Sequence, residues 1–259
     1  MRFMERVVSA IRYHKRWYLL EAAAVLVFLL ASLALWTLRQ ATSDMHQGFL
    51  ARLRLLTPSG AQAGPVAAAV NNSYAAVDQH FAIAWLILVA AALLLSLTFG
   101  WWSAHRRRSE SEAYLMLGKR PWAIAGQYVT ESLLTFAAAC LLTLLLVLLV
   151  GAQANRLLHD QASAALSAEL GRRISTSSLT QSMQTLFSHK LIEFAGPGLF
   201  FPGPPDASHL LFPLAGTLPT ILGGALALAV GAGLAAYLQL SQLRRRLLRS
   251  QALVRDHQS

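Results

Sequence analysis

The sequence has little charge and almost no cysteine. Only 13% of its 259 residues are charged and Cys140 is the single cysteine, whereas 55% of the residues are hydrophobic. One cysteine excludes an intrachain disulfide scaffold, and the apolar content excludes a disordered tail. A water-soluble enzyme of this length could not bury so much apolar surface. The composition therefore indicates a chain embedded in a lipid bilayer.

The sequence also lacks the motifs of familiar catalytic sites. Gly118-Lys119 has neither the upstream glycine nor the following hydroxyl residue of a phosphate-binding loop, so the chain does not hydrolyse ATP by that route. The eight histidines are scattered, without the spacing of a metal site. Asp206, Ser208 and His209 are the residue types of a hydrolase triad, but they lie too close together in a Pro-rich segment to form one. We predict a non-enzymatic chain with no catalytic residues, no metal and no cofactor of its own.

Four long apolar segments predict an all-α integral membrane protein with four transmembrane helices. The segments occupy 17–38, 81–103, 123–151 and 214–240. At a rise of 1.5 Å per residue the first segment reaches about 33 Å, which is enough to cross the hydrocarbon core. A cleavable signal peptide is the main alternative for this segment. Its apolar stretch is too long for that, and Arg39-Gln40 after it is no small-residue cleavage site.

The distribution of basic residues predicts the orientation of these helices. The chain has 22 Lys and Arg against 12 Asp and Glu. Five basic residues lie in each of 1–16, 104–122 and 241–259, whereas basic and acidic residues nearly balance in 39–80 and 152–213. The positive-inside rule therefore places both termini and the middle loop in the cytoplasm. The positive charge is then a topology signal, and no nucleic-acid partner is expected.

Two small segments are predicted on the extracytoplasmic side. Segment 39–80 is too small for an independent core. Segment 152–213 has two apolar stripes at helical spacing, which predict two short amphipathic helices. These stripes are formed by Leu158, Ala162, Ala165, Leu166 and Leu170, and by Leu179, Met183, Leu186, Phe187, Leu191 and Phe194. The Gly/Pro-rich loop that follows carries Leu199, Phe200 and Phe201, which either form a buried or membrane-dipping connector or contact a lipid or an outer partner.

Both predicted cytoplasmic ends of the chain are basic. Segment 1–16 has apolar residues at helical spacing between its basic residues. This pattern predicts an amphipathic helix on the anionic inner leaflet, although a leader that only sets the orientation would have the same composition. Segment 241–259 is predicted to be a basic tail.

Two carboxylates fall within the predicted spans. Glu21 and Glu131 each lie in the cytoplasmic half of their segment. A charged residue costs up to about 2.5–3.5 kcal/mol at the centre of a bilayer, so both carboxylates require an explanation. They could form a proton-transfer pair. Snorkelling, or pairing with Lys15, Arg16 or the arginines of the middle loop, is the simpler interpretation.

The last predicted span has small residues at every fourth position. These residues are Gly223, Ala227, Gly231 and Ala235. Small residues at this spacing let two helices approach closely. The pattern predicts tight packing and leaves open whether the neighbouring helix belongs to the same chain or to a second subunit.

Segment 106–134 is the most specific part of the sequence. It reads RRRSESEAYLMLGKRPWAIAGQYVTESLL and resembles the signature of FtsX-like permeases, the MacB-type or type VII membrane subunits of ABC transporters. The positions that match this signature at its spacing are Glu110, Leu117, Gly118, Ile124 and Glu131. The short outer segments are similar to those of compact four-span members, the Vex-type permeases.

The resemblance implies that 104–122 contains a coupling helix that docks on a separate ATPase subunit, with Leu115 and Leu117 as its apolar anchors. It also implies a structural or coupling role in the spans for Ile124 and Glu131, and we expect the same kind of role for Glu21, the other carboxylate within a span. The residues implied at the ATPase contact are Arg106, Arg107, Arg108, Glu110, Tyr114, Leu115, Leu117, Gly118, Lys119 and Arg120.

From this resemblance we expect the permease subunit of an ATP-driven ABC transporter in a bacterial inner membrane. Two ATP-binding subunits carrying ATP and Mg²⁺, a second permease that is identical or homologous, and membrane lipids are the implied partners. The output would be export or mechanotransmission at the outer face. Two alternatives belong to other classes: an ATPase-independent scaffold or sensor that binds an outer ligand through 152–213, and a proton-coupled secondary transporter that uses Glu21 and Glu131.

Overall fold

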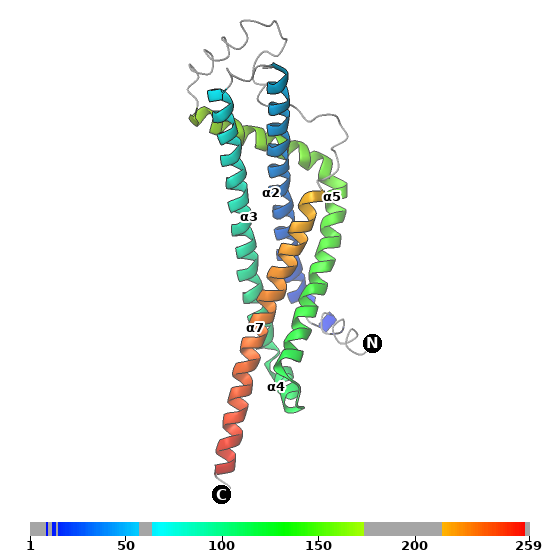
Figure 1. Ribbon diagram of the computed structural model, residues 1–259. Helices are drawn as coiled ribbons and strands as arrows, with labels where there is room; N and C mark the ends of the chain where they lie inside the picture. The colour runs from blue at the N-terminus through cyan, green and yellow to red at the C-terminus, as the bar shows by residue number, and fades with distance from the viewer. Residues whose placement is uncertain (1–8, 10–11, 14, 57–63, 174–213, 257–259) are drawn as a thin grey trace. The chain divides into compact units, whose positions relative to one another are not determined.

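The computed structural model describes residues 9, 12–13, 15–56, 64–173 and 214–256, and in these residues the chain is helical with short connections. The helices are α2 (Lys15–Leu56), α3 (Gly64–Arg106), α4 (Arg108–Met116), α5 (Pro121–Arg173) and α7 (Leu214–Asp256) (Figure 1). Four of them are long and apolar enough to cross a membrane. This confirms the predicted all-α class with four membrane spans.

Each long helix contains one predicted span and continues beyond it. The candidate spans run over Lys15–Ala51, Val70–Arg106, Pro121–Glu169 and Gly216–Arg245. With 42 residues, α2 is about 63 Å long, roughly twice the thickness of the hydrocarbon core. Part of segment 39–80, which we predicted outside the membrane, is therefore a direct continuation of the helices that contain the first two spans.

The surfaces of these helices suit a lipid environment. Large apolar side chains such as Leu94, Leu141 and Leu226 are exposed along α3, α5 and α7. Exposed leucines in such numbers would be unfavourable in water, but lipid tails cover them without cost. The chain is a multi-pass membrane protein.

Some predicted features lie outside the described residues. They include most of the amphipathic segment 1–16, the second apolar stripe of the outer segment, and the loop with Leu199, Phe200 and Phe201. The first stripe lies within α5, as a continuation of the helix of the third span and not as a separate short helix.

Contacts divide the chain into two compact units, and the first contains Met1–Ala31, Ile87–Leu145 and Leu218–Ser259. In this unit α2, α3, α5 and α7 lie side by side around two apolar clusters (Figure 1). The first cluster is formed by Val25, Phe28, Leu29, Phe136, Ala139 and Leu228. The second is formed by Ala104, Ile124, Ala125, Tyr128, Ala236 and Leu240, and it supports Tyr114 and Leu115 of α4.

Small residues set the spacing between α3 and α7 in this unit. A Cβ atom on Gly100 would lie 2.9 Å from the Ala232 Cα atom, and one on Gly231 would lie 2.7 Å from the Ser96 Cβ atom. The Ser96 hydroxyl donates to the Leu228 carbonyl at 3.1 Å, which such a close approach permits. The structure thus places this part of the predicted small-residue stripe against α3 of the same chain.

The remaining stripe positions differ in burial. Ala227 and Ala235 are buried, whereas Gly223 is half-buried. Gly224, one residue further along, lies against the rings of Phe28 and Phe136. Small residues of α7 therefore admit aromatic rings from α2 and α5 as well as the backbone of α3.

The second unit contains Ser32–Leu86 and Leu146–Thr217. Its core is formed by Met45, Phe49, Val70, Tyr74, Val77, Ala162 and Leu166. Arg39 forms a two-pronged ion pair with Asp78, at 2.7 and 2.9 Å, that joins α2 to α3. The predicted outer segment 39–80 does not build a core alone, because it shares one with α5 through Ala162 and Leu166 of the predicted first stripe.

Candidate functional site

Arg107 separates α3 from α4 and turns its side chain into the protein. Its backbone (φ −93°, ψ 24°) lies outside the α-helical region. Its N–H donates to the Ser103 carbonyl at 3.1 Å, and its own carbonyl accepts from the Ser111 N–H at 2.9 Å. The regular helix is therefore interrupted at Arg107 while both backbone groups keep hydrogen bonds.

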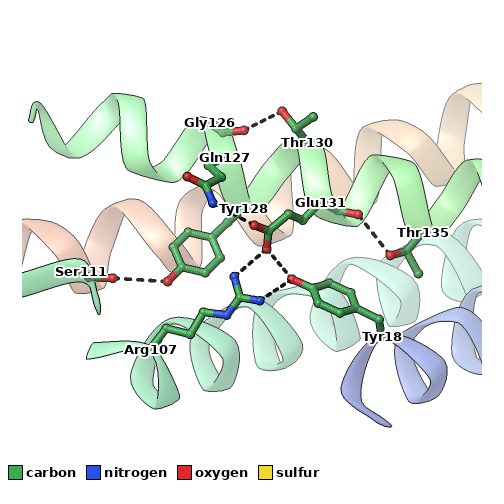
Figure 2. A network of polar contacts seen from close by, with 9 residues as sticks. All are labelled: Tyr18, Arg107, Ser111, Gly126, Gln127, Tyr128, Thr130, Glu131 and Thr135. Atoms are coloured by element: carbon green, nitrogen blue, oxygen red, sulfur yellow. Dashed lines mark hydrogen bonds and ion pairs between the residues drawn. The ribbon is translucent and has the colours of Figure 1, made fainter. Parts of the chain in front are cut away.

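The guanidinium of Arg107 meets a carboxylate in the interior of the first unit. Arg107 Nη1 lies 2.7 Å from Glu131 Oε2, and the two side chains are only 6% and 1% exposed. Arg107 Nη2 donates to the Tyr18 hydroxyl at 3.0 Å, and that hydroxyl donates to Glu131 (Figure 2). Gln127, one turn before Glu131 on α5, donates to its second oxygen at 3.0 Å. Side chains of α2, the α3–α4 junction and α5 thus share one buried polar network.

The positive charge of this network is permanent at physiological pH. Burial lowers the pKa of Arg107, but interactions with Tyr18, Glu131 and Tyr128 outweigh burial and raise it above its usual value. The ring faces of Tyr18 and Tyr128 lie 5.7 and 5.5 Å from the guanidinium carbon. A buried ion pair with additional hydrogen bonds can compensate for the desolvation of its charges. The structure shows that Glu131 pairs with an arginine of the 104–122 loop, which is one of the partners that the sequence offered.

Helix α4 has an inward and an outward face. Ser111 is buried and its hydroxyl is 3.2 Å from that of Tyr128 on α5, while Tyr114 and Leu115 pack against the cluster around Ile124 and Leu240. Tyr114 and Leu115 are therefore used, at least in part, for packing within the chain, and the predicted partner contact of Leu115 stays a prediction.

The end of α4 is exposed and apolar. Met116 is 74% exposed and Leu117 is 76% exposed. Gly118 has a φ of +78°, and the N–H groups of Gly118 and Lys119 donate to the carbonyls of Leu115 and Tyr114. This pattern is a Schellman motif, which ends a helix at a left-handed glycine. Pro121 then begins α5, at a position where proline needs no hydrogen bond.

The other predicted contact residues lie around α4 without forming one cluster. Arg106 is exposed and stacks on Trp17, with its guanidinium carbon 4.4 Å from the ring centroid. Arg108 forms an exposed ion pair with Glu112 at 2.9 Å. Lys119 lies 4.3 Å from the Tyr114 ring centroid. Glu110 and Arg120 are both exposed.

The two carboxylates within the predicted spans, Glu21 and Glu131, have different surroundings. Glu131 is paired as described above, whereas Glu21 is buried one turn after Tyr18 and accepts a hydrogen bond from Ser132. Ile124, which the family signature also marks, is buried in the cluster that supports α4. The structure gives Ile124 a packing role beneath α4.

Sequence reasoning missed several residues of this site. Tyr18, Gln127 and Tyr128 contribute to the network, and Trp122 lies exposed after the end of α4. The spacing between Gln127 and Glu131 was a usable signal, because residues four apart share a helix face. Tyr18 gave no such signal, since it lies 113 residues from its carboxylate partner.

Comparison with known families gives one match. Residues 81–188 match the family model of the FtsX-like permease C-terminal domain. This part of the chain is similar to an FtsX-like permease domain. No curated protein and no solved structure gives a further match. The matched segment begins in α3, includes Arg107 and α4, and continues through α5, so it covers most of the site described above.

The FtsX-like permease domain gives this geometry a functional context. Such domains are typical of non-catalytic membrane subunits of ABC transporters, and FtsX-like permeases generally pair with ABC ATPases. In this chain the matched domain joins two membrane spans through a short helix whose apolar end is exposed.

Proposed function

We propose that this chain is the membrane subunit of an ATP-driven ABC transporter and that the end of α4 docks on a separate ATPase subunit. The observation that carries the proposal is the exposure of Met116 and Leu117 at the end of a short helix inside the FtsX-like domain. A helix end with exposed apolar side chains suits a groove on a partner protein. Lys119 and Arg120 are exposed beside them and would contact acidic groups at the rim of that groove.

The expected orientation of the chain in the membrane also supports docking on an ATPase subunit. The 104–122 loop carries five basic residues, so the positive-inside rule places it in the cytoplasm, where an ATPase subunit would be found. In the proposed assembly two ATPase subunits hold ATP and Mg²⁺, and a second permease, identical or homologous, completes the membrane part. ATP-dependent closure of the ATPase pair moves α4, and the output at the outer face of a bacterial inner membrane is export or transmitted force.

The proposed apolar contact with the ATPase subunit differs from the one that the sequence indicated. Leu115 faces the core of its own chain, so the proposed anchors are Met116 and Leu117. Arg107 is buried in the network and contributes no direct contact. Trp122 is exposed after the loop and 6.1 Å from the Tyr237 ring, which is consistent with a place in the headgroup layer.

Replacing Leu117 by Asp is expected to abolish co-purification of the ATPase subunit, because a carboxylate at an apolar contact is left without its water shell. The measurement is the ATPase-to-permease ratio after purification in mild detergent. Ser109→Asp is the matched control, since it adds the same charge at an exposed position near the start of α4. Retention of the ATPase at the wild-type ratio in Leu117→Asp would contradict the proposed contact.

A further inference from the structure

We propose that Tyr18, Arg107 and Glu131 form a clamp that makes α4 move as one body with α2 and α5. Through this clamp, a displacement of α4 would reach the first and third spans directly. The proposal rests on the proposed function for the origin of the displacement. The clamp itself is a property of this chain and can be tested without a partner.

The first argument is that the clamp is closed. Arg107 contacts Glu131 at 2.7 Å and Tyr18 at 3.0 Å, and Tyr18 donates to Glu131. Each member therefore contacts both others, and they come from three different parts of the chain (Figure 2). If any one of the three segments moved away, a buried polar group would lose its partner, which is strongly unfavourable.

The second argument is that α4 is attached to the clamp and to α5 along its inner face. The Ser111 N–H donates to the Arg107 carbonyl, so the first turn of α4 is bonded to the clamp residue itself. The Ser111 hydroxyl contacts that of Tyr128 at 3.2 Å, and the Tyr128 ring covers one side of the Arg107 guanidinium. The start and middle of α4 are thus fixed, whereas its end at Leu117 is exposed.

The third argument concerns the bend between α3 and α4. Helix α3 ends at Arg106 and α4 begins at Arg108, with Arg107 (φ −93°, ψ 24°) outside helical values between them. The side-chain bonds at the bend run to Tyr18 of α2 and to Glu131 of α5. The side chain of Arg107 therefore links the start of α4 to α2 and α5, in addition to the backbone connection to α3.

The clamp can be tested by distance measurements between pairs of spin labels. Cys140 is replaced by alanine, and labelled cysteines replace Ala113 on α4 and Leu20 on α2, both of which are exposed. With an intact clamp the chain in lipid nanodiscs should give one narrow distance peak. Glu131→Gln should remove that peak in favour of a broad distribution, and Tyr18→Phe, a milder change, should broaden it by weakening the link to α2.

Glu112→Gln provides the matched control. It makes the same chemical change in the exposed Arg108–Glu112 ion pair of α4, and it should leave the peak narrow. A peak that stays narrow in both Glu131→Gln and Tyr18→Phe would overturn the clamp. If Glu131→Gln does not fold, Tyr18→Phe alone decides, because it removes only one hydroxyl.

A second experiment separates this proposal from the proposed function. In the ATPase complex, labels at Leu20 and Leu142, exposed residues of α2 and α5, should change distance when ATP is added. Glu131→Gln should keep the ATPase bound and hydrolysing ATP, yet lose this change. An unaltered ATP-driven change in that variant would overturn the clamp. Absence of any ATPase in the wild-type preparation would overturn the proposed function, while the first experiment would still decide the clamp.

Discussion

Replacing Arg107 by Ala is expected to destabilise the folded chain by about 3–5 kcal/mol, because it leaves the buried Glu131 carboxylate without its cation. Glu131 is 1% exposed in the folded chain, so its charge depends on its protein partners and not on water. The measurement is equilibrium unfolding in mixed detergent micelles with increasing SDS. The loss should appear as a shift of the unfolding midpoint to much lower SDS content.

Two further variants identify the cause of that loss. Arg108 is the next residue after Arg107 and forms an exposed ion pair with Glu112. Arg108→Ala removes this pair and should cost at most about 1 kcal/mol. The double variant Arg107→Met/Glu131→Leu removes both buried charges and should recover much of the stability lost in the single variant. A single variant as stable as Arg108→Ala would contradict the buried pair.

Replacing Gly100 by Leu is expected to force α7 away from α3. A Cβ atom at this position would lie 2.9 Å from the backbone of Ala232, which cannot rotate out of the way. Overpacking of this kind costs about 1–3 kcal/mol, and a side chain of four carbons falls at or above the upper end of that range. Thermal unfolding of the purified variant, followed by tryptophan fluorescence, measures the effect.

Gly126 supplies the matched control for this substitution. It is an exposed glycine of α5, and a Cβ atom added to it would have no neighbouring atom within 4 Å outside its own turn of helix. Gly126→Leu should therefore be neutral or slightly stabilising through helix propensity. Equal unfolding temperatures for the two leucine variants would show that α3 and α7 are not in close contact at Gly100.

The sequence was sufficient for the presence of the four spans, and it also carries a signal for the end of α4. Both are local properties: a long apolar run needs no partner to identify it, and Gly118 followed by a charged pair and Pro121 marks a helix boundary. The full length of the long helices could not be predicted from a local sequence pattern. Hydropathy reports where a segment leaves the membrane, whereas α2 continues to Leu56 with Met45 and Phe49 buried in a shared core.

The network around Glu131 could be predicted only in part. The cost of a carboxylate in a span required a partner, and the arginines of the next loop were available. Which arginine would pair, and that Tyr18 would join it, depends on the bend at Arg107 and on contacts between residues far apart in the sequence. Helical spacing places Leu115 and Leu117 on different faces of α4, and only the structure shows that Leu115 faces inward and Leu117 outward.

Site-specific photo-crosslinking from the end of α4 tests the central claim most directly. A photo-reactive amino acid in place of Leu117, introduced in cells that express the whole transporter, should give a covalent adduct containing an ABC ATP-binding subunit, recognisable by its P-loop peptide in mass spectrometry. The same residue in place of Leu148, exposed within a membrane span, should give no such adduct. An adduct with the ATPase from Leu148 but not from Leu117, or from neither position, would contradict the account.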